Sequence, residues 1–373
     1  MFNSMNNPFL NTTIGIIGGG QLGKMMAQSA KRQGYRVIVL DPQADCPTSQ
    51  VCDQQIVAGY DEPQALRQLA EQCDVITYEF ENVDCDTIAQ TLSPTLFPQG
   101  IRTLQVSQNR LAEKAFLTEQ NIPVGAFQTV RSVQDLASAI EKIGYPAVLK
   151  TTRFGYDGKG QVVLKSEVDL DKARQLAESQ ECVLEAWVNF EKEVSIMIGR
   201  NLNGDCSIFP VSENIHLNNI LHLSIVPARI SPSLAEKVQA CAEKIANALN
   251  LVGMLGVEFF VTENEVYVNE IAPRPHNSGH YSIEACNFSQ FDTAIAAVLN
   301  LPMPKIRLNS PVVMVNVLGQ HQQAVYAEKA RQPQWHFHDY GKHESKHNRK
   351  MGHITILGEI EASLNAITQT QIW

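Results

Sequence analysis

Charged residues are scarce in this sequence. Asp, Glu, Lys and Arg make up 18% of its 373 residues, against about 25% in an average soluble domain. This low charge disfavours both intrinsic disorder and a coiled coil. The net charge is −9 at pH 7. Because such a field repels a polyanion, we expect no nucleic acid among the partners.

Cysteine pairs of the CxxC type and long apolar runs are absent as well. We therefore expect the eight cysteines to be small buried side chains in a reducing compartment, not a disulfide framework or a zinc site. The stretch MFNSMNNPFL has no basic region, and no apolar run approaches the roughly 20 residues of a membrane span. These absences predict a cytoplasmic protein with no membrane partner.

Strands and helices are expected to alternate in the first hundred residues. Apolar strands at 13–18, 35–41 and 75–81 enclose helical segments such as 21–34, whose apolar residues recur on one face. Strands that alternate with helices predict a parallel sheet covered on both faces. The length of the chain predicts two to four packed units, of which this α/β unit is the first.

The rest of the chain has a mixed, α+β pattern. Helices are expected at 108–120, 132–142 and 233–250, and strands become frequent after residue 182. A proline-bearing run at 299–311 indicates a linker. We predict a Rossmann-like domain over 1–106, a central domain over 107–300 with a mobile lid at about 125–185, and a small β-rich domain over 301–373.

The first glycine loop, Gly18–Gly23, reads GGGQLG and lies between a strand and a helix. Such a loop lets backbone N–H groups approach a phosphate, and Asp41 ends the next strand where a dinucleotide fold binds ribose. Taken alone, this pattern favours a nicotinamide- or flavin-dependent dehydrogenase. Many α/β folds need glycine here only for a tight turn, so the motif is weak evidence.

A second glycine loop, RFGYDGKGQ at 153–161, follows a strand that ends at Lys150. Closely spaced glycines around a lysine suit a flap whose amides fold over phosphates. No Ser or Thr follows the lysine, so this is not a Walker A loop. A flexible surface hairpin is the alternative.

Two glutamates face each other in the predicted hairpin at 254–273. A three-residue turn over 263–265 would place Glu258 opposite Glu270. Their face would carry otherwise apolar or uncharged neighbours, namely Phe260, Thr262, Val266 and Val268. Two such carboxylates repel each other unless a cation lies between them, and oxygen ligands suit Mg²⁺. A solvated outer face is the alternative.

A rigid polar segment, Pro273–His280, follows the second glutamate directly. It brings one arginine and two histidines next to the carboxylates. Histidines satisfied by backbone groups in a proline-rich loop are the alternative, but the position beside a metal ligand favours catalysis.

Together these residues resemble the ATP-grasp superfamily, in its biotin-carboxylase-like branch. Within that branch the sequence is similar to the family of 5-(carboxyamino)imidazole ribonucleotide synthases of purine biosynthesis. The last two motifs are the most specific, and all occur in the family's order. The motifs are GGGQLG (18–23), YEFENV (78–83), RFGYDGKGQ (153–161), EAWV (185–188), NEIAPRPHNSGH (269–280) and RKMGH (349–353).

The resemblance implies an ATP-grasp fold with a Rossmann-like N-terminal domain and a small β-rich C-terminal domain. It implies an ATP-dependent carbon–nitrogen ligase that uses Mg²⁺ and no biotin. ATP would phosphorylate bicarbonate, and the resulting carboxyphosphate would carboxylate 5-aminoimidazole ribonucleotide, leaving ADP and phosphate. The family also implies a homodimer. Another ATP-grasp ligase is the alternative, although it would differ in YEFENV, PRPHNSGH and RKMGH.

The resemblance also assigns residues to roles. Glu258 and Glu270 would hold Mg²⁺. The catalytic residues would be Tyr156, Asp157, Arg274, His276 and Lys350. Those around the imidazole nucleotide would be Gln21, Leu22, Glu79, Asn277, Ser278, Lys342 and Arg349. Those around ATP would be Arg110, Lys150, Gly155, Tyr156, Asp157, Gly158, Lys159, Gly160, Gln161, Glu185, Ala186, Trp187, Val188, Glu193, His216, Asn269 and Glu270.

One residue departs from the family's pattern, and one segment of this acidic chain is basic. The family usually has glycine where Asn219 stands, and asparagine tolerates the left-handed backbone that such a turn needs. The run KHESKHNRK at 342–350 is basic in an acidic chain, which fits Lys342 and Arg349 on the substrate's phosphate. A solvated loop and a zinc site with His343 and His347 are the alternatives.

Overall fold

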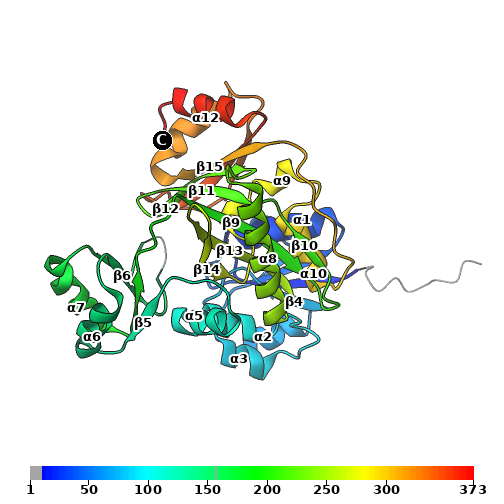
Figure 1. Ribbon diagram of the computed structural model, residues 1–373. Coiled ribbons are helices and arrows are strands. Elements are labelled where there is room, and N and C mark those ends of the chain that lie inside the picture. The colour runs from blue at the N-terminus through cyan, green and yellow to red at the C-terminus, as the bar shows by residue number, and fades with distance from the viewer. Residues whose placement is uncertain (1–10, 156–157) are drawn as a thin grey trace, which may run out of the picture.

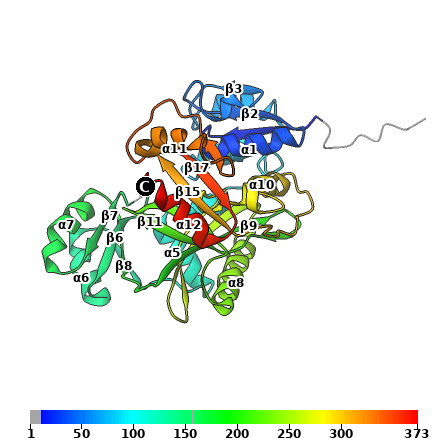
Figure 2. The same cartoon turned by 90° about the horizontal axis from the view of Figure 1, so that it is seen from above.

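The computed structural model describes residues 11–155 and 158–373. In this part of the chain the strands form a four-stranded N-terminal sheet, a four-stranded sheet in the lid region and a nine-stranded central sheet. Figures 1 and 2 show the lid region standing apart from the other two. Among the described residues, no helix is long and apolar enough to cross a membrane.

The N-terminal sheet is parallel, with strand order β3-β2-β1-β4, which confirms the predicted α/β unit. The helix after β1 buries Leu22, Met25, Met26 and Ala30, the face that the sequence indicated. The elements are β1 (Thr13–Ile17), α1 (Gln21–Arg32), β2 (Arg36–Leu40), β3 (Gln54–Ile56), α2 (Pro63–Ala70), β4 (Val75–Tyr78), α3 (Cys85–Thr91) and α4 (Arg102–Ser107).

The lid region has its own antiparallel sheet, in the order β5-β8-β6-β7. Leu136, Leu149 and Leu184 are among the buried side chains of a core that belongs to this region alone. The glycine loop joins β6 to β7, as the strand–loop–strand pattern predicted. The elements are β5 (Phe127–Val130), α6 (Val133–Ile143), β6 (Ala147–Thr151), β7 (Gln161–Leu164), α7 (Leu170–Ser179) and β8 (Cys182–Ala186).

The central sheet runs in the order β14-β13-β9-β11-β12-β15-β17-β16, with β10 paired to β9. Its strands are β9 (Lys192–Arg200), β10 (Cys206–Ile208), β11 (Ser212–Leu217), β12 (Ile220–Val226), β13 (Gly253–Val261), β14 (Val266–Ala272), β15 (Val312–Leu318), β16 (His336–Asp339) and β17 (Lys350–Leu357). The helices that accompany them are α5 (Arg110–Glu119), α8 (Pro232–Leu249), α9 (Ser282–Ala285), α10 (Gln290–Val298), α11 (Gln322–Lys329) and α12 (Ile360–Gln369).

The strands after the proline-bearing linker do not form a sheet of their own. β15 pairs with β12, so the C-terminal strands extend the central sheet. Two helices that the sequence analysis did not place, α11 and α12, belong to the same segment, and residues of both pack on a core with Val313 and Val315 of β15. The domain boundaries remain predictions.

The hairpin of β13 and β14 differs from the prediction in its turn. Val261 pairs with Val266, so four residues, not three, connect the strands. A β-bulge then shifts the register between Glu258 and Phe259, which places Glu258 opposite Glu270 after all. The prediction that Val266 and Val268 share the face of Glu258 is wrong, because both are buried in the core with Phe259 and Val261.

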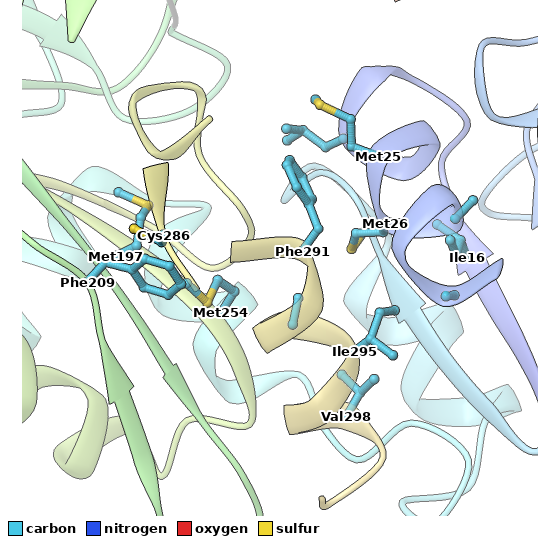
Figure 3. Packing of buried hydrophobic residues seen from close by; sticks show 14 of the residues in the cluster. Ile16, Met25, Met26, Met197, Phe209, Met254, Cys286, Phe291, Ile295 and Val298 are labelled. Carbon is cyan, nitrogen blue, oxygen red and sulfur yellow. The ribbon is translucent and has the colours of Figure 1, made fainter. Parts of the chain in front are cut away.

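A hydrophobic cluster joins the N-terminal unit to the central one. In Figure 3, Phe291 extends from α10 toward Met25 and Met26 of α1, with Ile295 and Val298 below it. Beside this cluster, Asp292 accepts hydrogen bonds from Ser29 (2.5 Å) and from Arg32. The two units therefore share one continuous core.

Candidate active site

The opposed glutamates lie beside a polar atom that lacks a protein partner. The bulge leaves Asn269 as the extra residue of β14 between Val268 and Glu270. The Asn269 side-chain oxygen is buried and has no hydrogen-bond partner. Burial and the neighbouring Glu270 raise the pKa of Glu258 to about 7. Two carboxylates and an amide oxygen without a hydrogen-bond partner fit Mg²⁺, whose ligands are oxygens.

Helix α5 brings Arg110 to these carboxylates. Asn109 caps the helix, because its side chain accepts hydrogen bonds from the N–H groups of Leu111 (2.9 Å) and Ala112 (3.1 Å). Arg110, the first residue of the helix, contacts Glu270 at 3.0 Å and Glu185 at 3.3 Å. It therefore links the carboxylate pair to the lid.

Glu185 is the centre of a buried group of cations. Its Oε2 lies 3.0 Å from Lys150 Nζ and 3.6 Å from Lys114 Nζ. Burial alone would raise the pKa of Glu185, but Lys150, Arg110 and Lys114 bring it down to about 2. Burial and the Arg110 charge lower the pKa of Lys150. Three cations around one carboxylate leave an excess of positive charge, which suits a phosphate chain.

The linker after Glu185 uses two of its amides within the protein. The N–H groups of Ala186 and Trp187 donate to carbonyl oxygens of Ala126 (2.8 Å) and Pro146 (3.1 Å). Trp187 is half exposed. A ligand at this linker would therefore find carbonyl groups and the Val188 amide rather than these two N–H groups.

Glu193 and His216 come together from neighbouring strands. Glu193 of β9 pairs with Asn214 of β11, and the His216 Nδ1 atom lies 3.0 Å from Glu193 Oε2. Although burial works against it, Glu193 and Glu258 raise the pKa of His216. His216 thus lies between the predicted ribose contact and the carboxylate pair.

The turn after His216 forms despite the departure at Asn219. Asn218 and Asn219 have φ values of 51° and 63° in the left-handed region, as expected of asparagine. The flap approaches this turn closely: a Cβ atom on Gly158 would lie 2.6 Å from the Asn219 side-chain nitrogen. A side chain at position 158 would therefore push the flap away from the turn.

The flap residues lie between β6 and β7. Gln161 pairs with Lys150, and the Thr151 amide donates to the Gly160 carbonyl (2.8 Å). A Cβ atom on Gly155 would lie 3.2 Å from the Lys159 carbonyl oxygen. The predictions for Tyr156 and Asp157 fall outside the described residues.

The Pro273–His280 segment, which follows β14, brings Arg274 to Glu81 and His276 to Glu258. One edge of the Arg274 guanidinium, Nε and Nη2, donates to Glu81 (2.5 and 3.1 Å), and His276 Nε2 lies 3.6 Å from Glu258 Oε1. Burial lowers the pKa of His276 to about 3, with Arg274 and Lys350 adding to the effect. Burial would raise the pKa of Glu81, yet Arg274 brings it down to about 2. His276 is therefore a neutral imidazole at pH 7.

Two further predicted substrate contacts follow in the same segment. The Asn277 side chain is buried, and neither its nitrogen nor its oxygen has a hydrogen-bond partner. The Ser278 hydroxyl contacts His276 Nδ1 (2.8 Å) and accepts from Ser195 (2.7 Å). Asn277 can thus receive a ligand, whereas Ser278 orients His276.

The N-terminal glycine loop is occupied by carboxylates of its own chain. The Gly19 amide donates to Asp41 (2.7 Å), and the Gly20 and Gly23 amides donate to the two oxygens of Glu79. A dinucleotide would need these N–H groups for its pyrophosphate. The loop therefore does not support the dehydrogenase alternative, and Glu79 holds the loop that leads into Gln21 and Leu22 of α1.

The basic run at 342–350 is docked on the N-terminal unit. Gly341 accepts a hydrogen bond from Gln50 (2.8 Å), and His343 contacts the Asp45 carbonyl oxygen (2.7 Å). Lys342 donates to the Lys350 carbonyl (2.7 Å), and Arg349 donates to that of Glu344 (2.9 Å).

Lys350, the first residue of β17, is near enough to Glu258, His216 and His276 to affect their pKa values. His343 contacts Asp45, while His347 lies near His321. Over residues 11–155 and 158–373, no group of three or more His, Cys, Asp or Glu side chains has a metal-binding arrangement. The tail thus supplies Lys350 to the site.

Three charged residues of this site were missed by the sequence analysis. Glu81 pairs with Arg274, Lys114 contacts Glu185, and Glu113 accepts a hydrogen bond from the Ile271 amide (3.1 Å). For the last two a signal existed, since they share the face of α5 that buries Phe116 and Leu117. A charge on an apolar helix face points to a buried partner.

Known protein families match three consecutive segments of the chain. Three family models match: the ribonucleotide synthetase preATP-grasp domain over 11–108, the ATP-grasp domain over 115–291, and the phosphoribosylaminoimidazole carboxylase C-terminal domain over 312–367. An N5-carboxyaminoimidazole ribonucleotide synthase of Staphylococcus epidermidis is 50% identical over 92% of both chains.

Solved structures resemble the whole chain. The Staphylococcus aureus N5-carboxyaminoimidazole synthetase complexed with ADP is 46% identical, with a TM-score of 0.94 and 97% of each chain covered. The Aspergillus clavatus enzyme in complex with ADP and 5-aminoimidazole ribonucleotide is 31% identical, with a TM-score of 0.90 over 97% of this chain and 98% of that one. The chain therefore belongs to the N5-carboxyaminoimidazole ribonucleotide synthases, ATP-dependent ligases of purine biosynthesis with the ATP-grasp fold.

Proposed function

We propose that this chain carboxylates the exocyclic amine of 5-aminoimidazole ribonucleotide with bicarbonate, at the expense of ATP. The γ-phosphoryl group would pass to bicarbonate, giving carboxyphosphate and ADP. The amine would then take up the carboxyl group and lose a proton, with release of inorganic phosphate. The observation that carries this proposal is the opposed pair Glu258 and Glu270, next to the buried cations around Glu185 and to Arg274 and His276.

Glu258, Glu270 and the Asn269 oxygen are the residues that would hold Mg²⁺, whose charge would offset that of the ATP phosphates. Arg110, Lys150 and Lys114 would bind the phosphate chain, because together they exceed the charge of Glu185. Glu193 would accept hydrogen bonds from the ribose hydroxyls.

Arg274 and His276 would act on the bicarbonate side. A guanidinium whose one side is fixed by Glu81 can still bind a planar anion such as carboxyphosphate through its remaining N–H groups. The contacts of Ser278 with His276 Nδ1 fix the ring, so a neutral His276 would present its Nε2–H to the anion as a hydrogen-bond donor. Lys342 and Arg349 would bind the 5′-phosphate.

An ADP-release assay with each component omitted in turn tests this proposal. We expect ADP formation to need divalent metal and to rise when both bicarbonate and 5-aminoimidazole ribonucleotide are added. Oxidation of a reduced nicotinamide instead of ADP release would refute it.

The family resemblance also leads us to propose a cytoplasmic homodimer. All eight cysteines are free thiols, which suits a reducing compartment. Light scattering of the purified protein would test the dimer, since a mass near 41.4 kDa means a monomer.

A further inference from the structure

Helix α5 forms hydrogen bonds with three consecutive residues of the bulged strand β14, namely Asn269, Glu270 and Ile271. Arg110 donates to the carbonyl of Asn269 (3.4 Å) and to the side chain of Glu270 (3.0 Å). Three residues later, Glu113 accepts from the Ile271 amide (3.1 Å). Residues three apart on a helix lie on the same face, so Arg110 and Glu113 meet the strand side by side. The bulge is thus held on both sides of Glu270.

Glu113 is a buried carboxyl group to which the proposed ATP site gives no role. The residue is 3% exposed. One carboxylate oxygen accepts the Ile271 hydrogen bond and the other has no hydrogen-bond partner. Burying a carboxyl group costs free energy unless it is paired or hydrogen-bonded. A role that needs only a hydrophobic contact would be served better by an apolar residue, so the hydrogen bond itself is the feature to explain.

A bulge is the part of a strand where the ladder holds the backbone least. The extra residue interrupts the regular hydrogen bonds of β13 and β14 next to Glu270. The Ile271 amide follows Glu270 directly. The group that accepts its hydrogen bond is Glu113, 158 residues away in the sequence. An acceptor from outside the hairpin therefore holds the backbone next to Glu270.

We propose that Glu113 is a positioning residue that fixes the bulge of β14 and so aligns Glu270 with Glu258 for a divalent cation. This inference rests on the proposed use of Mg²⁺. Groups that orient metal ligands typically account for about 10- to 100-fold in metal affinity. Removing the Glu113 carboxyl should therefore weaken the cation site while the nucleotide substrate still binds.

The test compares Glu113→Ala, Glu113→Gln and the control Glu119→Ala, which makes the same change on the exposed side of the same helix. Binding of Mn²⁺ to the ADP complex is measured by electron paramagnetic resonance, without turnover. We expect Glu113→Ala to bind Mn²⁺ roughly 10-fold more weakly. Glu113→Gln should bind within about 3-fold of the wild type, because the amide oxygen still accepts from Ile271.

Activity assays supply the second measurement. In Glu113→Ala the Mg²⁺ concentration for half-maximal ADP formation should rise by a similar factor, with KM for 5-aminoimidazole ribonucleotide unchanged. If Glu113→Gln loses Mn²⁺ binding as Glu113→Ala does, the charge matters and not the hydrogen bond, and the inference is wrong. It is also wrong if Glu113→Ala matches Glu119→Ala.

Failure of the proposed function can be distinguished from failure of the inference on Glu113. If the wild type forms ADP at full rate without divalent metal, the proposed function fails before Glu113 is considered. If Glu113→Ala does not fold, Glu113→Asp decides, because it keeps the charge and is one methylene too short for the 3.1 Å contact. Wild-type Mn²⁺ binding by Glu113→Asp would overturn the inference.

Discussion

The carboxylate of Glu270 is repelled by one neighbour and attracted by another. It faces Glu258 across the hairpin, which repels it, and it forms an ion pair with Arg110 at 3.0 Å. The side chain is 41% exposed, so water screens both interactions. A cation between the two glutamates would turn the repulsion into attraction. The residue is therefore suited to change partners between the free and the ATP-bound enzyme.

Replacing Glu270 with glutamine removes a charge from the proposed metal site and should lower kcat by at least about 10²-fold, the scale of losing electrostatic stabilisation of the transition state. The shape is kept, so the melting temperature should stay close to that of the wild type. Steady-state ADP formation at saturating Mg²⁺ measures the effect. Glu263→Gln, in the exposed turn of the same hairpin, is the matched control. Full activity of Glu270→Gln at limiting Mg²⁺ would remove the residue from the site.

Arg349 belongs to a loop with several other cations. A specific contact of Arg349 with the substrate phosphate can therefore be distinguished from nonspecific attraction by the loop's positive charge. Arg349→Ala should raise KM for 5-aminoimidazole ribonucleotide by roughly 10- to 100-fold, as expected for one charged hydrogen bond. KM for ATP should change little. Lys346→Ala, an exposed cation whose partner is Glu344, should leave both constants unchanged. An equal effect of the two substitutions would contradict a specific phosphate contact.

Residue types in motifs could be predicted from the sequence, but several of their partners could not. Lys150 and Glu185 were expected near the same ligand, and they are 3.0 Å apart. Glu81 and Glu113 were missed because each pairs with a group more than a hundred residues away, Arg274 and the Ile271 amide. The position of Glu113 on an apolar helix face indicated a buried partner, but which group each residue pairs with depends on how the units pack, and no local pattern encodes that.

In the hairpin of β13 and β14, the strands could be predicted from the sequence, but the length of the turn and the bulge could not. Alternation of apolar residues located both strands, and the register at Glu258 and Glu270 agrees with the prediction. The turn and the bulge each shift the register by one residue, and the two shifts cancel at this pair. Neither has a distinct sequence signal, since Glu263-Asn264-Glu265 suits turns of several lengths. The faces predicted for Val266 and Val268 were therefore wrong.

Strands β9 and β11 are joined to the chain after β12 by a buried carboxylate. Glu213 contacts Arg229 (2.8 Å) and Lys192 (2.9 Å), and although burial opposes it, these partners bring its pKa down to about 2. An unfolded chain has a glutamate pKa of about 4.3. The stabilisation is therefore complete above about pH 5 and is lost as the pH falls from about 4.5 toward 2.

Glu213→Gln should accordingly lower the melting temperature by a constant amount between about pH 6 and pH 8. The difference from the wild type should shrink as the pH is lowered from about 5 to 3, because the wild-type advantage disappears there. Differential scanning fluorimetry over this range measures it. Glu361→Gln removes a 77% exposed partner of Arg229 and should show no such trend. A difference that persists undiminished to pH 3 would contradict the assignment.

At the scale of the whole molecule, the core shared by α1 and α10 couples two units that were predicted as separate domains. Phe291 is 2% exposed and packs with Met25 and Met26 across that boundary. Truncation of a buried phenylalanine to alanine costs about 3–5 kcal/mol. Phe291→Ala should therefore melt at a markedly lower temperature, and the N-terminal unit should lose protection together with α10.

Scanning calorimetry and hydrogen exchange measure the two effects. Phe288→Ala, two residues before α10 and 44% exposed, is the control and should change the melting temperature little. An N-terminal unit that keeps its protection in Phe291→Ala would show that the shared core does not couple the units.

The arrangement of units was less predictable than the units themselves. Strand and helix patterns over thirty residues or fewer located the parallel sheet and the lid. The pairing of β12 with β15 joins residues about ninety apart, for example Leu223 with Val315. Both strands are apolar and could pair with many others, so the sequence could not show that the C-terminal strands extend the central sheet.

That pairing has a consequence for the synthesis of the chain. β15 is made late, yet it lies in the interior of the central sheet, and until it leaves the ribosome β12 has an open edge. The exposed N–H and C=O groups of Leu223–Val226 can then pair with another nascent chain. A gene truncated before Val312 should therefore yield aggregated protein rather than a smaller enzyme.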